Sequence, residues 1–205
     1  MIQLLMGGGW MMIPILGCSL LALTITIERG LQFRSLRFSR LGERMLKLAG
    51  QGKFADALTL AEQRHSPTLR VLAAGILHRE QQPDKAMEAA GIAEVSRLKR
   101  GLPALDTVIT LGPLLGLLGT IIGMIDSFGI MAKTGLGNPH AVTGGVAEAL
   151  ICTAAGICVA VITLIPYNYF LSQVEQETER IEQYATKLLA TIEEASPQKS
   201  GVDLS

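Results

Sequence analysis

The chain has 205 residues, and its 18 Lys and Arg balance its 18 Asp and Glu, so its net charge gives no reason to expect binding to nucleic acid. Charged residues make up 18% of the chain, whereas 49% are hydrophobic and 22 are glycine. An apolar, glycine-rich composition with only 4% aromatic residues favours closely packed helices in a membrane over a soluble globular domain.

Three long segments without charge predict three transmembrane helices. They lie at residues 1–27, 107–125 and 149–174. Each is long enough for the roughly 17–25 residues that a spanning helix needs. We therefore expect an all-α integral membrane protein with spans at 1–28, 103–131 and 142–170. The first should remain as an anchor, because it lacks the basic start and short apolar stretch of a cleaved signal peptide.

The positions of Lys and Arg predict the orientation of the spans. Fourteen of them lie in residues 29–102, one (Lys133) lies in 132–141, and three follow the last span. Positively charged loops remain on the cytoplasmic side. The sequence thus predicts an outer N-terminus, a cytoplasmic region at 29–102, a short outer loop at 132–141 and a cytoplasmic tail at 171–205 with a disordered end.

The cytoplasmic region is predicted to be helical, with prolines at two helix starts. Ser66 and Pro67 form a helix-start signal, and Pro83 begins another helix. That second helix has no strong stop before Leu102, so we expect it to continue into the second span with Pro103 as a bend. Apolar residues at helical spacing likewise extend the third span through residues 173–194. Two spans should therefore extend into the cytoplasm as long helices.

Small residues gather on one face of the second span. Steps of three and four residues align Gly112, Gly116, Gly119 and Gly123, and a similar small residue, Gly156, lies in the third span. Such faces let two helix backbones approach closely, which predicts a role in helix packing. The same face carries Thr120, whose hydroxyl alone indicates little because it can bond to its own backbone.

Glu148 is the exceptional residue of the third span. A carboxyl group within a span costs a few kcal/mol on insertion scales, and such residues usually face a cavity or the bundle interior on an ion path. The alternative is a protonated glutamic acid with a structural hydrogen bond. Helix rise places Thr120 and Glu148 at similar depth, with Thr153 about 7–8 Å further in. Three spans enclose little space, so a passage lined by these residues requires a ring of copies.

Two motifs resemble the MotA/TolQ/ExbB family of inner-membrane motor stators, especially its ExbB and TolQ branch. Residues 112–128 read GPLLGLLGTIIGMIDSF, and residues 147–156 read AEALICTAAG. By resemblance, Thr120, Glu148 and Thr153 would line the ion path. Two positions depart from the family pattern. Asp126 stands where the family usually has asparagine, and Pro166 comes about one turn after the usual proline position, which predicts a kink displaced toward the cytoplasm.

The resemblance also implies partners, a location and a function. Five copies would form a ring in a bacterial inner membrane, with the N-terminus and the short loop periplasmic and the C-terminus cytoplasmic. The ring would surround a dimer of an ExbD- or TolR-like single-span protein. Proton flow would then energise a TonB- or TolA-like protein that carries work to the outer membrane. Membrane lipids complete the expected surroundings, and no cofactor or metal is expected.

Several alternatives remain open at this stage. A TolQ-like role in the Tol-Pal envelope system fits the motifs as well as a role in uptake, and a membrane scaffold without ion flow is a second class of function. Sodium could replace the proton. An enzyme is not expected, because we find no Ser-His-Asp or Cys-His constellation, no phosphate-binding loop and no metal-ligand spacing.

Overall fold

The computed structural model describes residues 8–35, 41–63, 66–134 and 139–195. Every regular element in these ranges is an α-helix, which confirms the expected all-α class. The chain divides into two compact units. Unit 1 comprises Met1–Gly30 and Gly101–Phe170, and unit 2 comprises Leu31–Arg100 and Leu171–Ser205.

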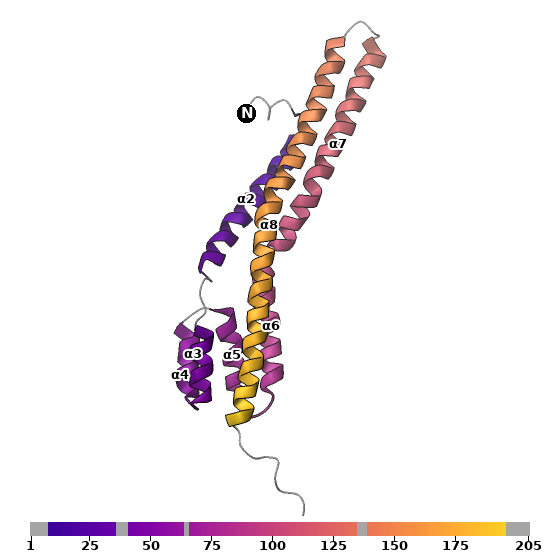
Figure 1. Ribbon diagram of the computed structural model, residues 1–205. Helices are drawn as coiled ribbons and strands as arrows, with labels where there is room; N and C mark the ends of the chain where they lie inside the picture. Colours follow the sequence, from indigo (N-terminus) through magenta and orange to yellow (C-terminus); the bar gives the residue numbers. More distant parts are fainter. Residues whose placement is uncertain (1–7, 36–40, 64–65, 135–138, 196–205) are drawn as a thin grey trace, which may run out of the picture. The chain divides into compact units, whose positions relative to one another are not determined.

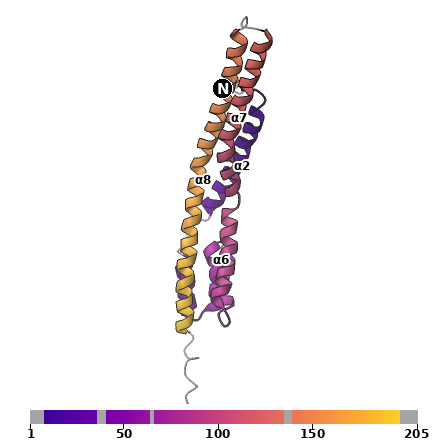
Figure 2. The ribbon, with the colours of Figure 1, turned by 90° about the vertical axis from the view of Figure 1, so that its right-hand side faces the viewer.

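Unit 1 is built from three long apolar helices. They are most of α2 (Met12–Ser35), α7 (Leu102–Thr134) and the first part of α8 (Pro139–Ala195). Figures 1 and 2 both show α7 and this part of α8 side by side, with α2 against them. Three helices of the described chain are long and apolar enough to cross a membrane, as the sequence predicts.

Large apolar side chains cover the outer surface of unit 1. On α7 alone, Leu114, Leu117, Ile121 and Ile125 are all at least 49% exposed. A soluble protein rarely exposes so continuous an apolar surface, whereas lipid tails solvate it without cost. The burial pattern thus agrees with a multi-pass membrane protein.

Unit 2 has the core of a water-soluble helical domain. Its helices are α3 (Leu41–Gly50), α4 (Phe54–Gln63), α5 (Pro67–Leu77), α6 (Pro83–Lys99) and the part of α8 after Phe170. The fully buried side chains at its centre include Met45, Leu69, Leu72, Ile76 and Leu188. Charged side chains cover the surface of these helices, as expected for an amphipathic helix in water.

The predicted helix starts at the two prolines occur in unit 2. Pro67 and Pro83 each stand at the first turn of their helices, where a missing backbone N–H costs nothing. Ser66 is the N-cap residue of α5, but its hydroxyl makes no capping hydrogen bond to the helix. The position of this helix start is therefore set by the proline more than by the serine.

The expected continuous helix from Pro83 into the second span is wrong. Helix α6 ends at Lys99, and α7 begins separately at Leu102. Gly101 has a φ of +85°, a left-handed conformation that stops a helix and that glycine adopts without strain. Its carbonyl oxygen then accepts the first hydrogen bond of α7, from the N–H of Leu105 at 3.3 Å.

The predicted helical continuation of the third apolar segment is confirmed. Helix α8 runs without a break for 57 residues and includes Pro166. The side chains of Val174, Ile181, Leu188 and Ile192 recur at helical spacing and are all buried. The end of the tail, residues 196–205, for which we expect disorder, lies outside the described residues.

Candidate functional site

The glycines of α7 and α8 lie where the two helix backbones touch. A Cβ atom added to Gly112 would stand 2.8 Å from the carbonyl oxygen of Gly156, and one added to Gly156 would overlap the carbonyl oxygen of Gly112. A Cβ atom on Gly116 would meet the Cα atom of Thr153 at 2.9 Å. Only glycine permits such an approach, since any side chain would press on backbone rather than on flexible atoms.

The same interface, called the glycine interface below, continues toward the start of α8. A Cβ atom on Gly119 would overlap the sulfur atom of Cys152, and one on Gly123 would meet the Cβ atom of Ala149 at 2.9 Å. Residue numbers rise along α7 as their partners on α8 fall, so the two helices are antiparallel. All five glycines that the sequence assigns to packing therefore lie in this contact.

Thr153 bridges the two helices. Its hydroxyl donates a hydrogen bond of 2.8 Å to the carbonyl oxygen of Gly116, which belongs to the other helix. A hydroxyl that donates its proton can still accept hydrogen bonds through its lone pairs. Thr153 can thus hold α7 against α8 and also present an acceptor oxygen.

Thr120 bonds within its own helix. Its hydroxyl donates to the carbonyl oxygen of Leu117 at 2.6 Å, as threonine often does in membrane helices. This is the local alternative that the sequence left open for the residue. Its oxygen likewise retains acceptor capacity.

Glu148 contacts the chain segment that precedes α2. A Cβ atom on Gly9 would overlap a carboxylate oxygen of Glu148, and Gly9 has a φ of +67°, so this position favours glycine for two reasons. The N–H of Met12 then donates to the carbonyl oxygen of Gly9 at 3.1 Å, which ties this turn to the start of α2. Among the described residues, no hydrogen bond or ion pair reaches the Glu148 carboxylate.

A pocket of about 230 Å³ lies beside Glu148. Residues from α7, from α8 and from the turn before α2 line it, including Gly9, Trp10, Asp126, Ser127, Gly145 and Glu148. Ser127 is buried and donates a hydrogen bond of 2.7 Å to the carbonyl oxygen of Gly123. Two carboxyl groups thus share one small pocket whose remaining walls are mostly apolar or glycine.

A small apolar cluster closes the pocket on one side. Met11 and Ile15 of the first apolar segment pack on Cys152 of α8, and all three are at most 5% exposed. Leu115 and Ile122 of α7 add partly buried contacts. This cluster fixes the start of α2 against the α7–α8 pair, and so fixes Gly9 beside Glu148.

A single chain brings together only part of the predicted ion path. Glu148 shares its pocket with Asp126, whereas Thr120 and Thr153 are not among the residues that line it. The latter two point their hydroxyl protons at backbone carbonyl groups instead. A shared passage for all three side chains remains a prediction that depends on other copies or a partner.

Sequence reasoning missed the part that Gly9 and Gly145 play. A Cβ atom on Gly145 would overlap the hydroxyl oxygen of Ser127, which places this glycine at the pocket wall. The run of three glycines at positions 7–9 and the pair at 144–145 were a visible signal. Their purpose depends on contacts between distant segments, which spacing along one helix does not reveal.

Three apolar helices, a glycine interface and a pocket with two carboxyl groups define the class of multi-pass helical membrane proteins. Residues 63–183 match the MotA/TolQ/ExbB proton channel family. The chain belongs to this family, within its ExbB and TolQ branch.

Named relatives support the same assignment. The putative biopolymer transport protein ExbB-like 3 of Synechocystis sp. is 36% identical over 86% of this chain and 91% of its own length. The ExbB-like 1 protein of the same organism is 36% identical over 84% of this chain and 71% of its own length. The Tol-Pal system protein TolQ of Pseudomonas aeruginosa is 35% identical, over 53% of this chain and 47% of its own length.

Proposed function

We propose that this chain is the ion-conducting stator subunit of a motor in a bacterial inner membrane. With an ExbD-like partner, it would use the proton motive force to energise a TonB-like protein for outer-membrane transport. The names of the Synechocystis relatives, which are putative biopolymer transport proteins, support this direction. The observation that carries the proposal is Glu148, a carboxyl group without a described partner inside a long apolar helix.

The proposed topology follows the distribution of charge. The spans would cover residues 1–28, 103–131 and 142–170, with a periplasmic N-terminus and a short periplasmic loop at 132–141. Residues 29–102 and 171–205 would lie in the cytoplasm, where their fourteen and three Lys and Arg residues agree with positively charged cytoplasmic loops. Unit 2 has the charged surface and apolar core that an aqueous compartment requires.

The proposed ring explains how polar groups at separate positions could serve one path. Around a shared axis, five copies would present Thr120, Glu148 and Thr153 to a single-span partner dimer at the centre. Both threonine oxygens retain lone pairs after donating to backbone carbonyls, so they can accept a hydrogen bond from water or contact a cation. The partner would supply the opposite wall of the path.

Glu148 would carry the ion by changing its protonation state. A carboxylate on a membrane-spanning helix is costly unless a proton neutralises it or another group pairs with it. Each proton that passes through 100 mV releases about 2.3 kcal/mol, enough to bias one position of the partner over the next. Directed movement would follow if proton transfer at Glu148 permits only one partner position at a time.

A proton-flux assay tests the role of Glu148. The complex with its co-purified partner is reconstituted in proteoliposomes, and flux is driven by a potassium diffusion potential. Glu148→Gln keeps the shape of the side chain but removes its charge, so flux should fall to background while assembly persists. Glu179→Gln, the same change at an exposed position of unit 2, is the matched control. Normal proton flux in Glu148→Gln would contradict the role in proton transfer that is proposed for Glu148.

A TolQ-like role in the Tol-Pal envelope system is the second candidate. The 35% identity to TolQ of Pseudomonas aeruginosa favours it specifically. Gentle purification from native membranes, followed by native mass spectrometry, separates the candidates. An ExbD-like partner supports uptake, and a TolR-like partner supports envelope maintenance. A ring without any partner that carries a membrane carboxyl group would leave a scaffold without ion flow as the better explanation.

A further inference from the structure

A groove of about 680 Å³ lies wholly within unit 2, between α6 and the later part of α8. It follows α6 from Asp84 to Lys99, a distance of about 22 Å at 1.5 Å per residue. This length corresponds to about four turns of a helix laid alongside. Nothing in the ion path uses this groove.

The floor of the groove is apolar. Val71, Met87 and Ile181 are buried beneath it, and Ile92 stands within it with 67% of its surface exposed. At this exposure the Ile92 side chain contributes little hydrophobic stabilisation to its own unit, because few neighbouring atoms shield it from water. An apolar side chain of a partner that packs against Ile92 would shield the apolar surface of both side chains from water.

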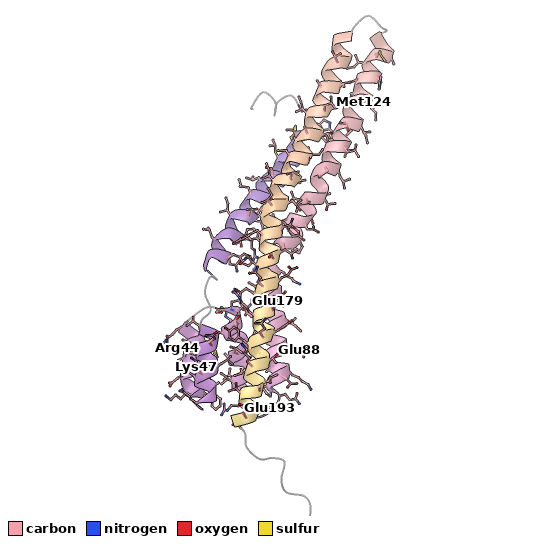
Figure 3. The ribbon with its side chains drawn as sticks, in the orientation of Figure 1. Arg44, Lys47, Glu88, Met124, Glu179 and Glu193 are labelled. Carbon is pink, nitrogen blue, oxygen red and sulfur yellow. The ribbon has the colours of Figure 1, made fainter. Side chains whose placement is uncertain are left out.

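The rim of the groove is acidic. Asp84, Glu88 and Glu182 line it with a single basic residue, Lys99. All three carboxylates are exposed, and no ion pair or hydrogen bond joins them to another described residue. Figure 3 labels Glu88 on α6.

Two glutamates on the helices that form the groove are paired with arginines, unlike the three carboxylates of the rim. Glu94 on α6 accepts bonds from Arg70 at 3.2 Å and from Arg97 at 2.8 Å. Glu177 on α8 pairs with Arg180 at 2.6 Å. The rim thus keeps three negative charges that a basic partner could approach, since the neighbouring arginines are already engaged.

Two other kinds of occupant fit this chemistry less well. Anionic lipid headgroups would be repelled by the carboxylates of the rim. Helix α3 of a second copy, which carries two basic residues, is a poor occupant because its Met45 and Ala49 are already buried in the core of its own unit. Its exposed side chains include Arg44 and Lys47, labelled in Figure 3, and no exposed apolar residue that could fill the floor.

We propose that the groove binds an amphipathic helix of a partner protein, one that carries an apolar stripe flanked by Lys or Arg. Apolar residues at positions i, i+3, i+4 and i+7 would fill the floor, as in other helix-in-groove complexes. The basic residues would lie against Asp84, Glu88 and Glu182 and set the orientation of the helix. This docking surface is independent of the ion path and of which ion flows.

Site-specific photo-crosslinking of the full-length protein in zwitterionic nanodiscs tests the proposal. A photo-reactive amino acid replaces Ile92, and the probe is a labelled peptide of about 15 residues with Leu at helical spacing and Lys beside it. A peptide of the same composition in scrambled order, and one with Glu in place of Lys, are the controls. We expect adducts with the basic amphipathic peptide and far fewer with either control.

Charge reversal sharpens the test. The double variant Glu88→Lys and Glu182→Lys should weaken the basic peptide's apparent affinity about tenfold, because two attractions become two repulsions. Glu62→Lys, an exposed position on α4 away from the groove, should leave it unchanged. Equal crosslinking of the scrambled peptide, equal affinity in the double variant, or no adduct at all would overturn the proposal. A crosslink between two copies of the chain would overturn it as well and assign the groove to self-assembly.

Discussion

The two units of this chain are both helical bundles, but they hold their helices together by opposite means. In unit 1, α7 and α8 meet through glycines, and the contacts there involve backbone atoms of Gly112, Gly116 and Gly156. In unit 2, the helices meet through large side chains such as Leu72 and Leu188, both fully buried. Unit 1 therefore turns its large apolar residues outward, and unit 2 turns them inward.

The difference follows from the solvent. In water, burying a large apolar side chain contributes about 1.5–3 kcal/mol, so the core of unit 2 uses the largest ones. Lipid tails offer no such gain, and helices associate there through close backbone approach and hydrogen bonds. The bond from Thr153 to the carbonyl oxygen of Gly116 belongs to this second kind of stabilisation. The variants below, ordered by expected effect, test the contrast.

The largest effect is expected from opening the core of unit 2. Leu72→Ala removes a fully buried side chain and should destabilise unit 2 by about 4 kcal/mol, through lost burial and a cavity. Hydrogen exchange of the purified protein, measured on the amides of α5 and α6, reports the change. Leu77→Ala on the same helix, where 63% of the side chain is exposed, should shift stability by less than about 0.5 kcal/mol. Similar losses in both variants would contradict the proposed core.

A smaller but clear effect is expected from adding one methyl group to unit 1. Gly156→Ala places a Cβ atom on the carbonyl oxygen of Gly112, and backbone cannot move aside as a side chain can. We expect about 3 kcal/mol of destabilisation, near the upper end for overpacking, measured by unfolding in mixed detergent micelles. Gly144→Ala on the same helix meets no atom within 4 Å and should be neutral or slightly stabilising. Tolerance of Gly156→Ala would mean that α7 and α8 do not touch there.

Removing one interhelical hydrogen bond should cost less. Thr153→Val keeps the shape of the side chain but loses the bond to Gly116, for a cost of about 1 kcal/mol. Thr153→Ser retains the hydroxyl and should restore most of that stability. Proton flux measured on the same two variants separates a structural role from a conducting one. Loss of flux in Thr153→Val without loss of stability would assign the hydroxyl to the ion path alone.

The smallest effect is expected from the second carboxyl group of the pocket. Asp126→Asn removes one negative charge near Glu148 and should lower proton flux about threefold. This effect corresponds to less than about 1.4 kcal/mol, the free-energy difference that represents a tenfold change. The loss should shrink as salt is added, because ions screen an exposed charge. Flux that stays unchanged at every ionic strength would show that Asp126 is no part of ion entry.

The sequence predicted the fold where the signal is local. Long uncharged runs predicted three apolar helices, and Pro67 and Pro83 marked two helix starts because proline excludes most other helix positions. The break at Gly101 was missed, since a glycine followed by Leu102 and Pro103 also fits a bent helix. The helix stops because Gly101 has a left-handed φ. Gly101 lies beside Ile25 and Arg29, which are far away in the sequence.

The candidate site was predictable only in part for the same reason. Glu148 was identifiable because a carboxyl group is rare and costly in an apolar helix. The contact of Glu148 with Gly9 and the bond from Thr153 to Gly116 join different segments of the chain, so no spacing along one helix reveals them. The rise per residue of a helix indicates which residues lie at similar depth in the membrane, but it does not determine which side chains share a pocket.

The contact between Gly9 and Glu148 has a consequence for biosynthesis. About 140 residues separate the two, so a ribosome that adds about 5–20 residues per second makes Glu148 roughly 7–30 seconds after Gly9. Until then the first apolar helix has no acidic pocket to close. A chain whose translation stops before Glu148 therefore lacks both the contact with Gly9 and the pocket that Glu148 shares with Asp126.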